Sequence, residues 1–284
     1  MSIVLVTGGA GNVGRQVVFE LAQGGHDVRV FDLPGLDYSF ASAHSNVEVL
    51  QGNICAESDL TGACKGVDWA VHLAAVMPPR SEKNNELANR INIEGTRSIL
   101  KALNPEIPII FASSAATYGA PTVPIVGIDH PQKPIDFYGE TKLQNEQDIL
   151  RNGRPFVMLR ISGVSVPALL EIPRPWFFRA SQRLEFVHLA DAAQAVVNCV
   201  GNEAVKGKVL QIAGGPTWQM TGQQYARAIC EAFDFPAENA TYQQQPGWTG
   251  WYETTESQNL LQYQNHGFEG FIDQLRALYK DAIG

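Results

Sequence analysis

The first thirty-two residues constrain the fold most, because they join a short apolar strand, a glycine-rich turn, a helical pattern and a second strand that ends in an acid. The turn reads Thr7-Gly8-Gly9-Ala10-Gly11-Asn12-Val13-Gly14, and the acid is Asp32. Gly8 permits a sharp turn, Gly11 lets a pyrophosphate approach the backbone, and Gly14 lets the helix pack close to the strand. The first helical amides, at Asn12 and Val13, would then face the phosphates. The segment therefore predicts a dinucleotide-binding βαβ unit.

Asp32 also indicates which dinucleotide binds. A carboxylate at this position accepts hydrogen bonds from both hydroxyls of the adenosine ribose and repels a 2′-phosphate. The residues that follow it, Leu33-Pro34-Gly35, include no arginine, and Arg29 lies inside the strand, where it is poorly placed to bind a phosphate. We therefore expect NAD rather than NADP as the cofactor.

The bulk composition limits the partners and the location. The 284 residues are 45% hydrophobic and 18% charged, which suits one large or two modest domains. A net charge of −8 without a basic run argues against nucleic acid, and no apolar window approaches the length of a membrane span. The four cysteines lack metal-binding spacing and are expected as free thiols. We expect no metal, no membrane partner and no signal peptide, and hence a cytoplasmic protein with a small-molecule substrate.

Strand-like and helix-like segments alternate through the first 160 residues. Strands are predicted at 3–6, 28–31, 47–50, 69–73, 107–112, 156–161 and later at 209–212, and helices near 13–23, 57–64, 86–103, 138–151, 221–233 and 269–281. This alternation predicts an α/β fold with a Rossmann-type, doubly wound parallel sheet. We assign residues 1–160 to an NAD-binding domain, to which 186–215 returns. Residues 161–185 and 216–284 form a small, discontinuous C-terminal substrate-binding lobe.

Tyr138 and Lys142 stand four residues apart at the start of a predicted helix, so both side chains can point into one cleft. A free tyrosine has a pKa of about 10, too high for efficient proton exchange at neutral pH. A nearby ammonium and a positive nicotinamide ring lower that pKa. Ser113 and Ser114 come at the end of the fifth strand, where a hydroxyl could donate to a substrate oxygen or could simply cap the strand.

Several segments that follow one another along the chain extend this pattern. They are the glycine turn, Asp32, His72-Leu73-Ala74-Ala75, Asn92-Ile93-Glu94-Gly95-Thr96, Ser113-Ser114 with Tyr118-Gly119, Tyr138-Gly139 with Lys142 and Glu146, Leu159-Arg160, and Phe186-Val187-His188-Leu189-Ala190-Asp191-Ala192-Ala193. Together they resemble the extended short-chain dehydrogenase/reductases, the NAD-dependent epimerase/dehydratase family, over about residues 1–215. The resemblance implies the Rossmann-type fold and NAD as the cofactor.

The resemblance also implies roles for single residues. Tyr138 is then the general acid/base, Lys142 lowers its pKa and binds the nicotinamide ribose, and Ser114 polarises the reacting C–O bond, with Ser113 as the fallback. Asn53 stands where the family usually has an aspartate near the adenine amino group, and His188 is interpreted as structural. The implied cofactor-binding residues are Gly8, Gly11, Asn12, Val13, Gly14, Asp32, Asn53, Ile54, Leu73, Ala74, Ala75, Asn92, Tyr138, Lys142 and Ile161, although Asn92 fits packing or capping equally well.

Departures from the family's sequence pattern reduce the set of reactions that we expect this chain to catalyse. Sugar-nucleotide dehydratases carry an acidic pair where this chain has Ala115 and Ala116, so an elimination has no evident acid. Nucleotide-sugar epimerases usually have an asparagine, and then a longer insertion, where this chain has Ile161-Ser162-Gly163. Apolar and aromatic residues are instead available either to line the cleft or to pack the lobe's own core. They are Met77-Pro78-Pro79, Leu169-Leu170, Trp176-Phe177-Phe178, Trp248, Trp251 and Tyr252.

These observations favour an NAD-dependent oxidoreductase that transfers a hydride at a secondary alcohol or ketone of a small, largely uncharged substrate. An NAD-dependent epimerase of a sugar or nucleotide sugar is the alternative, and a non-catalytic NAD-binding module is the second alternative. The lobe's Arg174, Arg179 and Arg183 lie among prolines and aromatic residues. We therefore expect no nucleoside diphosphate in the site, since its phosphates are normally bound by free arginines.

A homodimer is expected, because closed two-fold assemblies dominate among soluble oligomers and the family commonly pairs two helices of each subunit into a four-helix bundle. The two helices are those predicted near 86–103 and 138–151. Leu87, Ile91, Leu143 and Ile149 could supply the apolar surface, although each fits the subunit's own core equally well.

Overall fold

A seven-stranded sheet forms the centre of the computed structural model, which describes residues 1–169 and 171–284. Its strands are β1 (Ile3–Thr7), β2 (Asp27–Asp32), β3 (Val47–Gln51), β4 (Trp69–His72), β5 (Ile109–Ser114), β6 (Phe156–Ile161) and β10 (Lys208–Ile212). They pair in the order β10-β6-β5-β4-β1-β2-β3, and every pair is parallel. The fold is therefore the expected α/β, Rossmann-type doubly wound sheet, and its strands lie close to their predicted positions.

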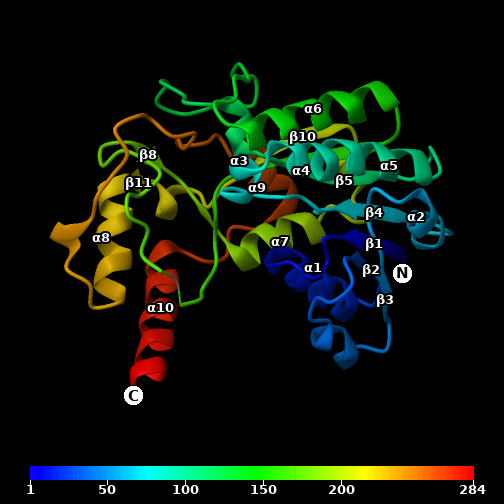
Figure 1. The fold of residues 1–284 in the computed structure, drawn as a ribbon, viewed down its shortest axis with the longest axis horizontal. Coiled ribbons are helices and arrows are strands. Elements are labelled where there is room, and N and C mark those ends of the chain that lie inside the picture. Colours follow the sequence, from blue (N-terminus) through cyan, green and yellow to red (C-terminus); the bar gives the residue numbers. More distant parts are fainter. Residues whose placement is uncertain (170) are drawn as a thin grey trace.

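Helices cover both faces of the sheet (Figure 1). Because side chains alternate along a strand, Val4 and Val6 of β1 pack under α1 (Asn12–Gln23) and α7 (Leu189–Val197), whereas Leu5 packs on the opposite side. That opposite layer contains α2 (Glu57–Ala63), α5 (Gly95–Ala102) and α6 (Phe137–Asn152). α7 is absent from the helices that the sequence predicts, and its N-cap residue is His188.

Two details near the carboxyl edge of the sheet differ from the predictions. The helix predicted at 86–103 is a chain of α3 (Arg80–Lys83), α4 (Asn85–Ala88), the π-helical η2 (Asn89–Glu94) and α5. A π-helical turn inside a helix often marks a functional position. The fifth strand lies two residues later than predicted, because Ser113 and Ser114 continue the ladder opposite Arg160 and Ile161.

The lobe is assembled from segments that are distant in sequence. Its elements are β8 (Arg183–Leu184), β11 (Met220–Thr221), α8 (Gly222–Ala232) and α10 (Phe268–Ile283). The connecting elements β7 (Val164–Ser165), β9 (Val187–His188) and α9 (Thr255–Leu261) pack on the sheet domain. Short 3-10 helices are η1 (Ser39–Ala43), η3 (Ala115–Tyr118), η4 (Glu203–Val205), η5 (Pro216–Trp218) and η6 (Ala237–Asn239). α8 begins with a capping box between Thr221 and Gln224 and packs against α10.

Aromatic packing holds the lobe together. Trp176, Phe178 and Trp218 are buried in its core together with residues of α8 and α10, and Trp248 packs against that core. Tyr252 is buried beside Tyr118, under the loop that follows β5. Most of the aromatic residues noted in the sequence therefore serve packing, while Met77, Leu169 and Phe177 stay exposed and Leu170 lies outside the described residues.

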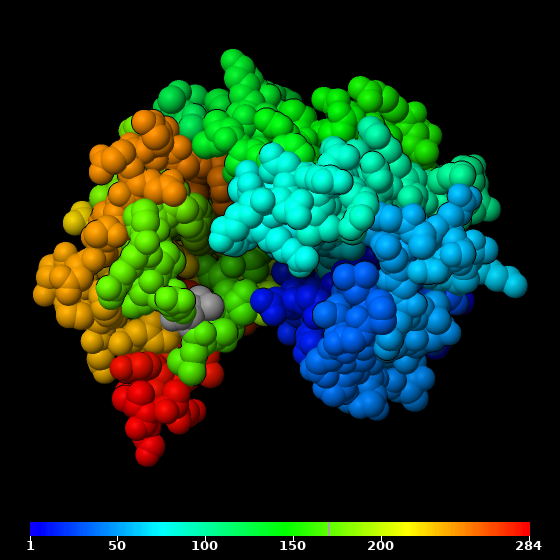
Figure 2. Space-filling view, viewed as in Figure 1, coloured from blue at the N-terminus to red at the C-terminus, as the bar shows by residue number. Residues whose placement is uncertain are grey.

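A hollow separates the lobe from the N-terminal part of the molecule on the face drawn in Figure 2. Dark blue N-terminal residues border the hollow on one side, and the lobe borders it on the other. Within the described ranges, no helix combines the length and the apolar character needed to cross a bilayer. The four cysteines are free thiols.

Candidate active site

The glycine turn is shaped to bring a ligand close to the backbone. Gly8 has a φ of +73°, and a Cβ there would lie 2.6 Å from the backbone nitrogen of Ala74, which follows β4. A Cβ on Gly14 would collide with the carbonyl oxygen of Gly8, so α1 can approach the strand only because this residue is glycine. No side chain among the described residues caps α1 at Gly11. The first-turn amides of the helix are therefore suited to a pyrophosphate, and the cradle fits the dinucleotide.

Asp32 lies beside this turn at the end of β2. Its Oδ2 accepts a hydrogen bond from the Ala10 amide at 3.0 Å, and its Oδ1 accepts one from Leu33 at 2.9 Å. Each oxygen retains a lone pair for a ribose hydroxyl. Arg29 is directed elsewhere, since its guanidinium binds Glu48 and two backbone carbonyls on the far side of the strand.

Three of the expected cofactor-binding residues lie at strand ends: Asn53 and Ile54 follow β3, and Ile161 is the last residue of β6. Asn53 uses its amide oxygen to accept a hydrogen bond from the Cys55 amide, which leaves that oxygen only one further lone pair for an adenine amino group. Ile54 is buried in the core below and contacts the Cα of Gly95 closely enough that a Cβ there would lie 2.7 Å from it. Ile161 is buried at the end of β6, paired with Ser114.

Tyr138 and Lys142 lie together on the first turns of α6, which begins at the N-cap Asp136. The Lys142 Nζ lies 5.6 Å from the centre of the Tyr138 ring and 4.8 Å from that of Phe111. It donates a hydrogen bond of 2.7 Å to the carbonyl of Ala112 in β5. Both side chains are buried, so the pair lies in a low-dielectric site near the carboxyl end of β5.

Burial dominates the protonation of this pair. It lowers the pKa of Lys142 to about 7, although the nearby Glu146 carboxylate acts in the opposite direction. Burial and the Asp136 carboxylate raise the pKa of Tyr138. This direction is opposite to the one expected from a lysine alone, because burial takes the phenolate out of water and the Asp136 carboxylate repels it. A lower tyrosine pKa therefore depends on the positive nicotinamide ring as well.

The two serines of β5 have separate partners. Ser113 donates a hydrogen bond of 2.5 Å to the Glu146 carboxylate, so its hydroxyl is committed to the interior. Ser114 accepts a hydrogen bond from the Ala116 amide and caps η3, which leaves its own hydroxyl proton available for a substrate oxygen. The start of α6 packs on η3, since a Cβ on Gly139 would lie 2.8 Å from the Ala116 carbonyl. This packing places the start of α6 against the turn that Ser114 caps.

Asn92 connects the cleft segment after β4 to α6. Its side-chain oxygen accepts from the Val76 amide at 2.7 Å, and its amide nitrogen donates to the Val76 carbonyl and to the Thr141 hydroxyl. The backbone carbonyl of Asn92, inside the π-helical turn, accepts from Asn145. Asn92 thus fixes the segment that carries Leu73, Ala74 and Ala75 through protein contacts of its own side chain.

A buried ion pair between Arg160 and Glu146 supports the site, and the sequence alone predicts no role for it. Arg160 donates to both carboxylate oxygens of Glu146, at 3.0 and 2.8 Å, and also to the hydroxyl of Tyr118. Glu146 is one helical turn beyond Lys142 and also holds Ser113. The only sequence signal was the position of Glu146 and Arg160 in the motifs that define the resemblance.

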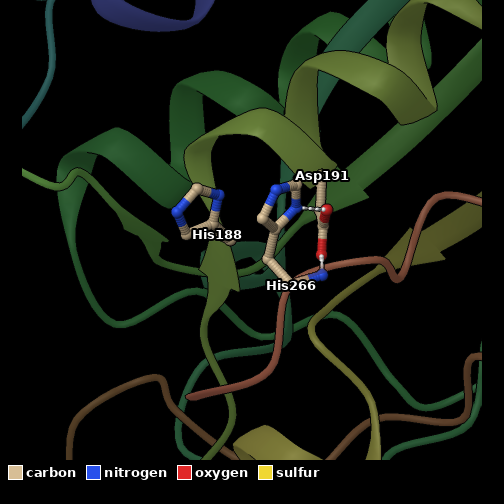
Figure 3. A group of neighbouring side chains, drawn as sticks. All are labelled: His188, Asp191 and His266. Atoms are coloured by element: carbon tan, nitrogen blue, oxygen red, sulfur yellow. Dashed lines mark hydrogen bonds and ion pairs between the residues drawn. The ribbon is translucent and has the colours of Figure 1, made fainter. Parts of the chain in front are cut away.

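A second polar group lies where α7 meets the segment before α10 (Figure 3). Asp191 accepts a hydrogen bond of 2.5 Å from His266, and the ring of His188 stacks on that of His266. His188 accepts from the Ala190 amide and pairs with Gln274 through its other nitrogen. These hydrogen bonds occupy the carboxylate and three of the four ring nitrogens. The group therefore ties two segments together.

Comparison with known proteins identifies the family. A model described as "NAD dependent epimerase/dehydratase family" matches residues 4–168. The chain belongs to this family. Its resemblance to the extended short-chain dehydrogenase/reductases is thereby confirmed, and with it the NAD cofactor.

Curated relatives of different activities are similar to parts of the chain. The human sterol-4-alpha-carboxylate 3-dehydrogenase (decarboxylating) is 32% identical over 161 residues, which are 53% of this chain and 40% of the relative. The uncharacterized protein y4nG of Sinorhizobium fredii is 30% identical over 221 residues, 72% of this chain and 54% of that protein. The UDP-glucose 4-epimerase of Lactobacillus helveticus is 35% identical over 150 residues, covering 51% and 45%. The chain thus spans about half the length of these relatives.

Solved structures share the whole fold. A short-chain dehydrogenase/reductase superfamily protein from Agrobacterium tumefaciens with bound NAD has a TM-score of 0.81 at 20% identity, over 99% of this chain and 98% of that one. The UDP-glucose 4-epimerase of Thermotoga maritima with UDP-glucose has a TM-score of 0.83 at 19% identity, over 99% and 100%. At such identities the likeness shows the fold alone.

Proposed function

We propose that this member of the family is an NAD-dependent oxidoreductase that acts on a secondary alcohol or ketone of a small, largely uncharged substrate. The observation that supports this substrate class is the state of the lobe arginines. Arg174 stacks on Phe235, Arg183 stacks on Trp251, and Arg179 donates to the carbonyl of Gln244 at 2.7 Å. These contacts hold the three side chains against other residues of the lobe, whereas a diphosphate needs guanidinium groups that face it in bidentate fashion.

Each step of the proposed reaction can be assigned to the cofactor or to a side chain of the site. Bound NAD supplies the acceptor or donor of the hydride. The Tyr138 hydroxyl passes a proton to or from the substrate oxygen, and Ser114 donates a hydrogen bond to the same oxygen. In its protonated form Lys142 places a positive charge beside the Tyr138 ring, and its hydrogen bond to the Ala112 carbonyl orients it. Ala115 and Ala116 provide no acid for an elimination, so proton transfer and hydride transfer would complete the reaction.

A titration of the NAD-loaded protein with UDP-, GDP- and dTDP-sugars tests the substrate class. We expect no binding at micromolar concentrations, because Arg174, Arg179 and Arg183 are held against lobe residues. Binding of any of these compounds in the micromolar range would overturn the proposal.

The second candidate function is epimerisation of a sugar or nucleotide sugar, which the similarity to UDP-glucose 4-epimerases favours. An epimerase keeps its cofactor through a full cycle, whereas a dehydrogenase releases reduced cofactor at each turnover. Extraction of the purified protein with acid, followed by measurement of nucleotide per chain, separates the two. Near-stoichiometric NAD would favour the epimerase.

We also propose a cytoplasmic homodimer formed through η2, α5 and α6. Ile149 is fully buried in the subunit's own core and Ile91 packs against it, so these residues do not supply the contact. Leu87 and Leu143 are half-buried, and Leu150 at the end of α6 is 53% exposed. Light scattering should give about twice the 31.0 kDa chain mass at micromolar concentration, and the monomer mass would count against this assembly.

A further inference from the structure

We propose that Glu82 is a positioning residue for Tyr138, because its carboxylate binds the first amides of α6 from a separate helix, α3. The inference rests on the proposed role of Tyr138 as the acid/base. Glu82 belongs to none of the motifs that carry the family resemblance, so neither the motifs nor the substrate class assigns it a role.

The first turn of α6 needs hydrogen-bond partners from outside the helix. The amides of a first turn have no acceptor within their own helix, and helix ends fray. Tyr138 is the second residue of α6, whereas Lys142 lies one turn further in, where the helix provides its own backbone hydrogen bonds. A displacement of about 1 Å in a reacting group can cost roughly 10²-fold in rate. The placement of Tyr138 therefore depends on how this turn is anchored.

Glu82 supplies most of that anchor. Its Oε2 accepts a hydrogen bond from the Phe137 amide at 2.9 Å, and its Oε1 accepts one from the Tyr138 amide at 3.1 Å. The N-cap residue Asp136 accepts from the third amide, that of Gly139, at 2.7 Å. A carboxylate at this end also complements the positive end of the helix dipole. Two of the three first-turn amides thus depend on an acid that lies 55 residues before Phe137.

The carboxylate of Glu82 is itself held in place. The hydroxyl of Ser81 donates to its Oε1 at 2.9 Å, and Ser81 is fully buried. α3, which carries both residues, packs beside α6 (Figure 1). The acceptor of the two amides is therefore fixed by the fold.

The carbonyl of Tyr138 is connected to the same part of the chain by a second route. It accepts a hydrogen bond of 2.8 Å from the Thr141 hydroxyl. That hydroxyl accepts one of 3.1 Å from Asn92, which also binds the amide and the carbonyl of Val76. The segment from Val76 to Glu82 is thus tied to Tyr138 at both of its ends, through the Tyr138 carbonyl and the Tyr138 amide. Loss of Glu82 opens this closed set of hydrogen bonds at the amide.

The experiment follows the backbone and the side chain of Tyr138 in the NAD⁺-loaded protein. Hydrogen exchange measured by NMR reports the amides of Phe137 and Tyr138. Fluorine NMR of protein labelled with 3-fluorotyrosine reports the ring, and Tyr138→Phe assigns its resonance. In Glu82→Ala we expect both amides to exchange at least tenfold faster and the Tyr138 resonance to broaden at least twofold. Glu82→Gln keeps one acceptor oxygen, so its exchange should be at least threefold faster and its linewidth should fall between those of the other two proteins.

A matched control removes the same charge from a neighbouring position. Glu86 lies in the first turn of α4, and Glu86→Gln should leave the exchange rates and the Tyr138 linewidth unchanged. Glu82→Gln preserves the shape of the side chain and gives the same comparison if Glu82→Ala does not fold. A variant that lowers Tm but leaves the Tyr138 resonance as in the wild type would show a structural role alone and overturn the proposal, as would an equal effect of Glu86→Gln. Near-normal turnover of Tyr138→Phe would instead overturn the acid/base role, whatever the fluorine spectra show.

Discussion

The sheet domain and the lobe each bury a carboxyl group, but the two groups differ in whether a positive charge is paired with them. In the sheet domain, Glu146 is paired with Arg160 and both side chains are less than 10% exposed. In the lobe, Glu185 is fully buried and accepts hydrogen bonds from the Gly215 and Tyr252 amides and the Gln219 side chain. No cation in the described part of the chain pairs with it. An acid that lacks a counter-charge keeps its desolvation cost, so burial raises the pKa of Glu185 to about 7.

This difference predicts how the stability of each region responds to pH. The pair in the sheet domain holds Ser113 against α6 through the Glu146 carboxylate. The lone acid of the lobe joins β8, η5 and the segment around Tyr252 through hydrogen bonds alone. Stability of the lobe should therefore depend on pH through Glu185.

The largest effect is expected from breaking the ion pair. Glu146→Ala leaves the buried Arg160 without its counter-charge and should lower the free energy of unfolding by about 3–5 kcal/mol. Glu146→Leu combined with Arg160→Met removes both charges and should cost less than the single change. Chemical denaturation of the variants measures this. If the double variant is less stable than Glu146→Ala, the hydrogen bonds of the network stabilise the fold in addition to its balanced charges.

The next effect concerns the acid/base itself. Tyr138→Phe keeps the ring and removes the hydroxyl, so turnover should fall by roughly 10²-fold or more while NAD binding persists. Steady-state kinetics and calorimetry on the same preparation provide both values. Near-normal turnover would remove Tyr138 from the mechanism. Phe111, buried next to Lys142, offers a control: Phe111→Leu should change turnover far less.

The lone acid of the lobe predicts a pH dependence of stability. Since the pKa of Glu185 is raised to about 7 in the folded protein, the folded state binds more protons than the unfolded state above pH 5. Stability should thus fall by roughly 2 kcal/mol between pH 5 and 8. Lys142, with its pKa lowered to about 7, adds a slope of opposite sign above pH 7.

The difference between the wild type and Glu185→Gln isolates the carboxyl group. The glutamine variant loses one acceptor near Gly215 and should be less stable at pH 5, but that gap should shrink as the pH rises to 8. Parallel denaturation curves at both pH values are the measurement. A gap that is constant with pH would mean that Glu185 does not titrate in this range.

The smallest effect tests the cofactor side of the sheet domain. Asp32 should make NAD⁺ bind at least tenfold more tightly than NADP⁺, a difference of about 1.4 kcal/mol. Calorimetry on the unmodified protein measures it. Equal affinities would show that Asp32 does not exclude the 2′-phosphate.

The sequence was sufficient for features that depend on local order. The glycine turn, the alternation of strands and helices, and the spacing of Tyr138 and Lys142 each specify a geometry within a few residues. The parallel, doubly wound sheet followed from this alternation. The unpredicted α7 shows the limit: its apolar, alanine-rich pattern has no local signal beyond the preceding His188, and it forms by packing on α1.

Side-chain partners across the fold could not be derived in the same way. The partner of Ser113 is Glu146, a residue of another element, and the contacts of Arg174, Arg179 and Arg183 come from lobe segments elsewhere in the chain. The sequence by itself determined the sheet, the glycine turn and the position of Tyr138 and Lys142 at the start of a helix, because backbone geometry and periodicity act over short range. Only the tertiary structure decided which charges are paired and which are free, because burial and hydrogen-bond partners arise from contacts between distant segments.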